Sequence, residues 1–278
     1  MNTGPNEERT ASTNGIMIHV RSWKSNAAPR AVIVVCHGVN SHGGQYLWTG
    51  DQLAKAGFAA FALDLRGRGR SDGPRFRVSD IDEYVSDVAA VITLAKSRNP
   101  GLPVFLLGHS AGGVTSCSYA LDHQHELKGL ICESFAFRVP APGFVLSAIK
   151  GLSRIVPNVP VLKLKMKDFT RESAALAALE ADPLTRSEAQ PAITVAALVR
   201  ANERLEREFN RITIPVFILH GTMDKATMPV GSRIFYERAG SQDKKLQLYD
   251  GFYHDLLNDI GKDKVMADIV AWIDARLS

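Results

Sequence analysis

Short apolar runs alternate along the chain with longer segments in which apolar residues recur every three or four positions. The runs are rich in β-branched and aromatic residues, as strands are, whereas the longer segments have the spacing of amphipathic helices. This alternation is typical of an α/β protein, in which helices cover both faces of a mostly parallel sheet. We expect strands at residues 16–23, 31–36, 58–63, 104–107, 127–132, 215–219 and 245–249.

Helical spacing is clearest in three segments outside these strands. Residues 45–56 have it, and Ser79 and Asp82 form a capping pair ahead of a second segment that reaches Ala95. The third segment closes the chain, where five apolar residues between 265 and 277 share one helical face.

The alternation stops after Phe137 and resumes with the strand at 215–219. Six prolines punctuate the segment between them, and a structureless loop of this length is improbable in a compact domain. We therefore expect an inserted helical cap at residues 138–211 and a core formed by residues 1–137 and 212–278.

Apolar residues recur at helical spacing from Phe144 to Val156 in the expected cap, with Lys150 and Arg154 among them. Three interpretations stay open for this segment: a helix packed on the core, a lid that lines an apolar substrate slot, or a helix in transient contact with a membrane surface. In the second interpretation Phe144 and Ile149 contact the substrate.

Composition and charge limit the classes of partner. The 278 residues are 45% hydrophobic and 22% charged, and the net charge of +4 comes from 33 basic and 29 acidic residues along the whole chain. The one basic cluster, at 66–77, is interleaved with glycines like a loop, so we expect no nucleic-acid partner. Residues 1–15 lack an apolar signal core, and no run approaches the roughly 18 residues that span a bilayer, so we expect no transmembrane segment.

Three cysteines lie in apolar or small-residue stretches: Cys36, Cys117 and Cys132. An odd number at such positions indicates buried free thiols and a reduced, cytoplasmic compartment. The sequence does not indicate an oligomeric state.

Ser110 stands between two glycines, directly after the strand expected at 104–107 and before a run of small residues. Where a strand turns abruptly into a helix, the serine at the apex is strained, and only residues without bulk fit two positions before and after it. Gly108 and Gly112 meet that demand, so the sequence predicts an exposed nucleophile. The alternative is a glycine-rich turn that only packs or that cradles a phosphate.

A nucleophilic serine needs a base that takes its proton and a third group that orients the base. Asp224 follows a core strand and His254 follows the last strand, and ligand sites of parallel sheets gather at such strand ends. The chain order serine, aspartate, histidine is the one expected of this type of sheet. Glu133 and Asp255 remain alternatives for the acid, and His220 is interpreted as structural.

The oxyanion formed by attack on a carbonyl needs two hydrogen-bond donors. The backbone N–H of Ala111 lies at the N-terminus of the helix after the serine, and that of Val39 follows the strand at 31–36. His37 beside Val39 has two interpretations, a base or, more simply, a residue that fixes this loop. No Cys/His spacing indicates a metal and no Gly-x-Gly-x-x-Gly motif indicates a dinucleotide, so we expect neither a metal nor a cofactor.

Four motifs in register resemble the α/β-hydrolase superfamily and, within it, the monoacylglycerol lipase and lysophospholipase-like group. They are the serine motif 108–113, the arginine-rich loop 64–73, the acid loop 220–224 and the histidine loop 249–254. The resemblance extends from Gly15 over almost the entire chain. It implies an α/β-hydrolase fold with an eight-stranded sheet and an inserted helical cap.

The resemblance also implies the chemistry, a serine hydrolase that cleaves carboxylic esters through an acyl-enzyme. Ser110, Asp224 and His254 then form the catalytic triad, and Val39 and Ala111 provide the oxyanion hole.

The implied substrate is a small-molecule ester, monoacylglycerol-like or another small apolar ester. The chain departs from the group in its alcohol-binding loop, where Ser41 and Gln45 replace a glutamate and an arginine. We expect Asn40, Ser41 and Gln45 to contact the substrate. The alternatives are an esterase of aromatic or polyester-derived esters, an acyltransferase or perhydrolase with the same triad, and a non-catalytic ligand-binding protein.

Overall fold

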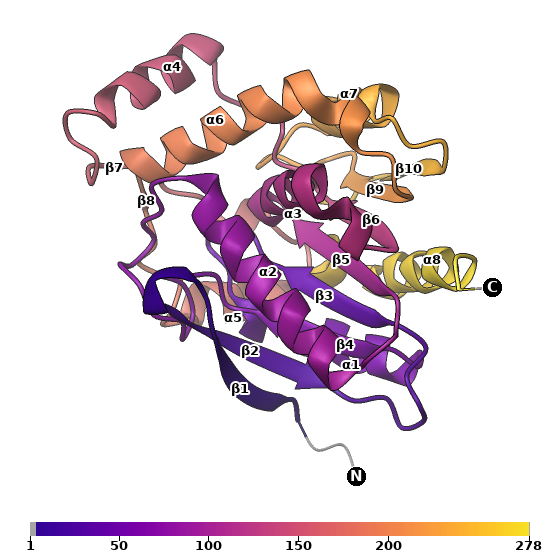
Figure 1. Ribbon diagram of the computed structural model, residues 1–278. Helices are drawn as coiled ribbons and strands as arrows, with labels where there is room; N and C mark the ends of the chain where they lie inside the picture. The colour runs from indigo at the N-terminus through magenta and orange to yellow at the C-terminus, as the bar shows by residue number, and fades with distance from the viewer. Residues whose placement is uncertain (1–3, 278) are drawn as a thin grey trace.

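An eight-stranded sheet forms the centre of the computed structural model, which describes residues 4–277 (Figure 1). Residues 1–3 and 278 of the expected core lie outside the described residues. The strands of the sheet are β1 (Asn6–Ala11), β2 (Met17–Trp23), β3 (Val32–Cys36), β4 (Ala59–Leu63), β5 (Val104–His109), β6 (Gly129–Glu133), β9 (Val216–Gly221) and β10 (Lys244–Tyr249).

Their order across the sheet is β1-β2-β4-β3-β5-β6-β9-β10. All neighbours from β4 to β10 are parallel, and β2 is antiparallel to both β1 and β4. The prediction of a mostly parallel, eight-stranded sheet is confirmed. The carboxyl ends of the parallel strands therefore meet at one edge, where ligand sites collect.

Helices cover both faces of the sheet. One face carries α2 (Ile81–Arg98), α3 (Ala111–His123) and α7 (Pro229–Arg238), and the other carries α1 (Leu47–Lys55) and α8 (Lys262–Asp274). Alternate residues of β3 show the division, since Val32 and Val34 pack in the first hydrophobic cluster whereas Ile33 and Val35 pack in the second. Burial of both faces explains why the central strands are continuous apolar runs.

Two details differ from the sequence-based prediction. β1 was not expected, because its sequence is polar and its residues are largely exposed at the sheet edge, where they pair only with β2. The capping box of α2 is formed by Asp80 and Glu83, and not by Ser79 and Asp82. Ser79 instead donates its backbone N–H to Glu83 Oε1 at 2.7 Å.

Residues 138–211, called the insertion below, separate β6 from β9. The insertion contains α4 (Gly143–Leu152), β7 (Pro160–Leu162), α5 (Ser173–Ala181), β8 (Gln190–Pro191) and α6 (Ala192–Glu208). α4 and α6 lie side by side at the top of Figure 1. Ala197, Ala201 and Leu205 of α6 belong to the hydrophobic cluster of the sheet, whereas α4 has no buried residue. The insertion is thus anchored through α6, and α4 is its outermost helix.

Short 3-10 helices complete the described chain: Thr13–Gly15, Gly43–Tyr46, Gln124–Glu126, Met166–Asp168, Phe209–Arg211 and Leu256–Asn258. Between residues 4 and 277, the structure contains no helix with the length and apolar character that crossing a bilayer requires.

Candidate active site

Ser110 lies at the junction of β5 and α3 with φ +56° and ψ −119°, a conformation that residues with side chains rarely adopt. The flanking glycines make the turn possible. A Cβ atom on Gly108 would lie 2.5 Å from the carbonyl oxygen of Gly112, and one on Gly112 would lie 2.2 Å from that of Cys36. The strained turn predicted from the sequence is therefore present. Glycines are needed on both sides of the serine because neighbouring backbone segments approach too closely there for a Cβ atom.

The loop after β3 approaches the serine from the other side. A Cβ atom on Gly38 would lie 2.9 Å from the Ser110 Cβ, and Val39 and Ala111 line the same cavity as Ser110. Their backbone N–H groups are thus on segments that meet at the hydroxyl.

His37 holds this loop in place. Its Nε2 accepts the N–H of Leu65 at 3.0 Å, so the ring proton is on Nδ1, which donates to the Gly38 carbonyl at 2.7 Å. Burial lowers the pKa of His37 to about 3, so the ring is neutral near pH 7. Both nitrogens are engaged, which favours the loop-fixing interpretation of His37 over a base.

Asp224 and His254 meet in the loops that follow β9 and β10. His254 Nδ1 lies 2.8 Å from Asp224 Oδ2, and both side chains are fully buried. Asp224 Oδ1 accepts the backbone N–H groups of Ala226 and Thr227 at 2.8 and 2.9 Å, and the Thr227 hydroxyl donates to Oδ2 at 2.7 Å. Each of these groups donates a hydrogen bond to the carboxylate, as expected for an ionised acid.

His220 is a further partner of Asp224. Its Nε2 lies 3.0 Å from Oδ2, and its Nδ1 lies 2.7 Å from the Ser232 hydroxyl. Burial by itself would raise the pKa of Asp224, but the charges and hydrogen bonds of His254 and His220 outweigh burial and lower it. The interpretation of His220 as merely structural overlooked this contact, although a histidine four residues before the acid, at a strand end, was a usable signal.

The other nitrogen of His254, Nε2, is buried and has no hydrogen-bond partner among the described residues. His109 packs against the His254 ring with centroids 4.7 Å apart, and Phe169 of the insertion packs edge-on with centroids 4.8 Å apart. These contacts and Asp224 orient the ring and leave Nε2 able to accept a proton.

The alternatives for the acid have other partners. Glu133 Oε1 accepts the N–H of Leu257 at 3.1 Å, and Asp255 Oδ2 accepts the side-chain amide of Asn258 at 3.0 Å. Burial raises the pKa of both carboxyls, that of Asp255 to about 6. With His109 they form the one cluster of possible metal ligands in the described part of the chain, with ligand atoms within 4.8 Å of one another.

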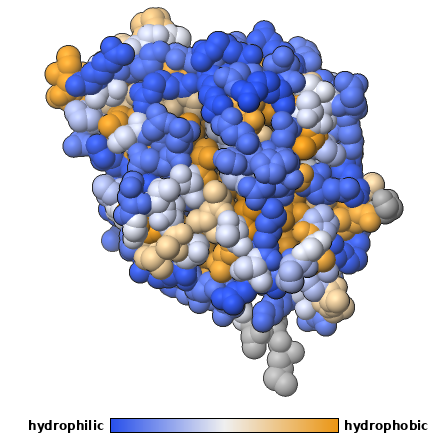
Figure 2. All heavy atoms as spheres, viewed as in Figure 1, coloured by the Kyte–Doolittle hydropathy of each residue, from blue (hydrophilic) through white to orange (hydrophobic). Residues whose placement is uncertain are grey.

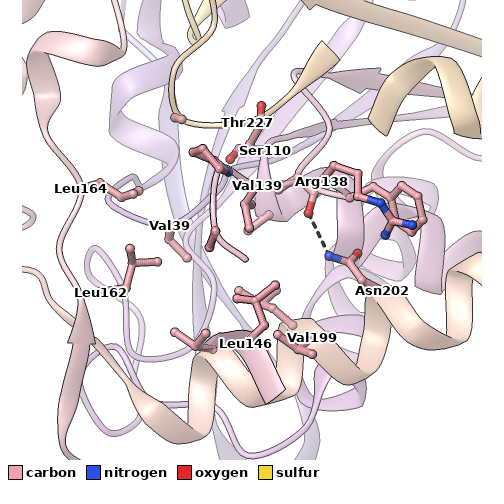
Figure 3. Close-up of a pocket in the computed structure, with 18 of the residues that line it drawn as sticks. Val39, Ser110, Arg138, Val139, Leu146, Leu162, Leu164, Val199, Asn202 and Thr227 are labelled. Carbon is pink, nitrogen blue, oxygen red and sulfur yellow. Dashed lines mark hydrogen bonds between the residues drawn. The ribbon is translucent and has the colours of Figure 1, made fainter. Parts of the chain in front are cut away.

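A cavity of about 740 Å³ opens beside Ser110, between the core and the insertion. Figure 3 shows apolar side chains around it, with Leu162 and Leu164 on one side and Arg138 and Asn202 on the other. Pockets for small molecules measure about 300–1,000 Å³ and are mainly apolar. The cavity therefore has the size and character to hold a hydrocarbon chain next to the serine.

Only one of the five residues expected to bind substrate lines this cavity, namely Ile149. Phe144 is 76% exposed on the outer side of α4, so its expected place in the slot is corrected. Asn40, Ser41 and Gln45 do not line the cavity either. Gln45 donates to Asp182 Oδ2 of the insertion at 3.1 Å, and Asn40 contacts the insertion as well, so these polar groups join loops together.

Large apolar residues are exposed on α4 and the loop after it: Phe144, Leu152, Ile155, Val156 and Val159. In Figure 2 apolar residues appear at the upper left, over the region of α4, and others are spread across the middle of the same face.

Comparison with known proteins relates these features to a family. The family described as serine aminopeptidase, S33, matches residues 27–261. The monoacylglycerol lipase of Mycolicibacterium smegmatis is 30% identical over 273 residues, which are 98% of each chain, and human monoglyceride lipase is 31% identical over 270 residues, which are 95% of this chain and 89% of that protein. The crystal structure of Paleococcus ferrophilus monoacylglycerol lipase matches with a TM-score of 0.84 at 29% identity, over 93% of this chain and 99% of that one.

Proposed function

The chain belongs to the serine aminopeptidase S33 family of α/β hydrolases, and from this premise we propose that it is a serine hydrolase of monoacylglycerol-like carboxylic esters. The observation that carries the proposal is Ser110, held in its strained turn at the wall of an apolar cavity of about 740 Å³. The paired Asp224 and His254 side chains supply the base that this hydroxyl needs.

Hydrolysis proceeds in two steps. The Ser110 hydroxyl attacks the ester carbonyl carbon while His254 Nε2 takes its proton. The resulting oxyanion accepts hydrogen bonds from the backbone N–H groups of Val39 and Ala111. The carbon–oxygen bond to the alcohol then breaks, and the alcohol leaves with the proton from His254. Water attacks the acyl-enzyme in the same way, with His254 as base, and releases the carboxylic acid and free Ser110.

Asp224 acts through His254. Its carboxylate accepts a hydrogen bond from Nδ1–H, so the proton of the neutral ring stays on Nδ1 and Nε2 is ready to act as base. The imidazolium formed during each attack is stabilised by the adjacent negative charge, which two backbone N–H groups and Thr227 hold in place.

The cavity accounts for the acyl part of the substrate. Leu146, Val195, Leu198 and Val199 present hydrocarbon to the space beside the serine, so an aliphatic acyl chain loses its contact with water there. Ser41 and Gln45 do not line the cavity, so they do not restrict the alcohol part directly. We expect a small neutral alcohol, such as glycerol, with tolerance for other alcohols.

The insertion serves as the cap of this active site, because its residues form much of the cavity wall. Its exposed apolar residues, together with Lys150 and Arg154, are suited to transient contact with a lipid surface that carries the substrate. The free, buried cysteines are consistent with a cytoplasmic location.

The decisive test compares wild type with Ser110→Ala. We expect the variant to lose p-nitrophenyl butyrate hydrolysis by several orders of magnitude and to lose labelling by a fluorophosphonate probe. Equal activity of the two proteins would overturn the proposed function. A panel of esters that varies acyl and alcohol parts separately, with products identified in the presence of glycerol, then separates hydrolysis from acyl transfer and defines the substrate.

A further inference from the structure

Glu188, a fully buried carboxylate of the insertion, contacts the loop that follows β3. Its Oε1 accepts the backbone N–H of Asn40 at 2.7 Å. The same oxygen accepts hydrogen bonds from Arg68 and from the side-chain amide of Gln190. One carboxylate oxygen thus joins the insertion, the loop after β4 and the loop after β3.

The contact falls next to the residue that matters for catalysis. Val39 lies between two peptide groups, and both are anchored. The Gly38 carbonyl, in the peptide that carries the Val39 N–H, accepts from His37 at 2.7 Å, and the Asn40 N–H, in the following peptide, donates to Glu188. Because each peptide group is planar, these two anchors fix the direction of the Val39 N–H.

The backbone of Asn40 supports this interpretation independently. Its φ is +55°, in the left-handed region that few residues other than glycine, asparagine and aspartate adopt. Such a conformation persists where the surroundings hold it, and Glu188 supplies the hydrogen bond to this peptide. Gln190 adds a contact from its side-chain amide to Asn40 Oδ1 at 3.4 Å.

Arg68 holds Glu188 in turn. Its guanidinium pairs with Glu188 and donates to Gln190 Oε1 at 2.8 Å and to the Tyr84 hydroxyl at 3.0 Å. The side chains of Arg68 and Glu188 are 1% and 0% exposed, so the carboxylate has no freedom to leave its position.

We propose that Glu188 is a positioning residue of the oxyanion hole, which it completes from the insertion by holding the Asn40 N–H and so aiming the Val39 N–H. The inference rests on the proposed function, since it assumes that an oxyanion forms at Ser110. The oxyanion hole is then complete only when this part of the insertion is docked on the core.

The test uses two double variants that differ in one acceptor. Removal of Glu188 alone leaves a buried arginine unpaired, which threatens folding, whereas replacement of both charges together is tolerated far better. Arg68→Met/Glu188→Gln retains an oxygen for the Asn40 N–H, and Arg68→Met/Glu188→Met does not. The exposed Glu180→Gln on α5 is the control for an unrelated change in the insertion.

An oxyanion donor acts in the transition state, so its displacement lowers kcat and leaves KM nearly unchanged. We expect kcat of the Met/Met variant to be about 10- to 100-fold below that of the Met/Gln variant, with KM within about twofold. A trifluoromethyl ketone forms an adduct with the serine that carries an oxyanion. We expect the Met/Met variant to bind it more weakly than the Met/Gln variant by the same factor, while the melting temperatures of the two variants are similar.

Equal kcat values in folded Met/Met and Met/Gln variants, or a loss confined to KM, would overturn the role of Glu188. If neither of these double variants folds, Arg68→Leu/Glu188→Gln and Arg68→Leu/Glu188→Leu provide the same comparison without an unpaired charge, with ketone affinity measured on the folded fraction. Ser110→Ala in the same assay keeps the two proposals apart: full activity there contradicts the proposed function, whereas wild-type behaviour of the Glu188 variants contradicts only this inference.

Discussion

His220 and His254 contact the same oxygen of one carboxylate, with His220 Nε2 at 3.0 Å and His254 Nδ1 at 2.8 Å from Asp224 Oδ2. Two imidazole rings thus hold Asp224. The Ser232 hydroxyl, 2.7 Å from His220 Nδ1, holds the His220 ring in turn. A carboxylate so fixed would keep the orientation of the His254 ring constant through both steps of the proposed reaction.

This relationship predicts the behaviour of His220 variants. His220→Gln retains an N–H donor near Asp224, whereas His220→Leu of similar volume does not. We expect kcat of the leucine variant to be at least about 10-fold below that of the glutamine variant, since a hydrogen bond to a charged group contributes about 1.5–3 kcal/mol and ten-fold corresponds to about 1.4 kcal/mol. Steady-state kinetics on one ester measures the ratio, and identical kcat values would show that His220 only fills space.

The sheet and the pairing of Asp224 with His254 were predictable from the sequence for one physical reason. Apolar runs mark strands that are buried on both faces, and the ends of parallel strands meet at one edge, so residues that follow two strands come together. β1 escaped the prediction because an edge strand buries little and its polar sequence carries no such pattern.

The contacts of the insertion were not predictable in this way. The expectation for Asn40, Ser41, Gln45 and Phe144 came from resemblance and from helical spacing, neither of which states how the insertion docks. In the structure Phe144 faces outward, and the Asn40 loop is joined to Glu188, 148 residues further along the chain. Such long-range polar contacts depend on tertiary placement and leave no periodic signal.

Buried carboxyls predict how stability depends on pH. Burial raises the pKa of Glu133 and, to about 6, that of Asp255. An acid whose pKa is raised in the folded state favours folding while it is protonated. This contribution is fully present below the pKa of the unfolded chain, about 4, and is lost as the pH rises through the pKa of the folded protein. We therefore expect the free energy of unfolding of the wild type to fall between about pH 4 and pH 7 from this cluster.

Glu133→Gln isolates the effect. The amide still accepts the N–H of Leu257 and does not ionise, so the free energy of unfolding should rise at pH 7.5 and stay unchanged near pH 4. Urea unfolding at both pH values measures it, with Glu180→Gln as control. A stabilisation of equal size at both pH values would contradict the assignment.

Gly112 predicts a steric effect on the nucleophile. In Gly112→Ala the new Cβ would lie 2.2 Å from the Cys36 carbonyl and 2.5 Å from that of His37, both backbone atoms. The loop that carries Val39 must then move, so we expect kcat/KM to fall at least 100-fold, with a destabilisation of about 1–3 kcal/mol.

Gly113→Ala is the matched control on the same helix. Its nearest obstacle is the Phe135 ring at 3.1 Å, which is able to shift, so we expect a loss of activity below about threefold. The rate of fluorophosphonate labelling and the melting temperature are measured for both variants. Equal labelling rates would mean that the close approach of backbones at Gly112 does not matter for the serine.

The cavity predicts which acyl chains are accepted. Leu146 of α4 lines it, so Leu146→Trp fills space that a long acyl chain would occupy, while esters of acetate need only the region next to Ser110. Each methylene excluded from an apolar site removes about 0.8 kcal/mol, so the loss of two or three corresponds to a roughly 10- to 50-fold lower kcat/KM for a dodecanoyl ester. The value for the acetyl ester should change by less than about twofold.

Leu152→Trp is the control, because Leu152 is on the same helix, 39% exposed, and does not line the cavity. If the two tryptophan variants had the same chain-length profile, the acyl chain would have to lie elsewhere on the protein.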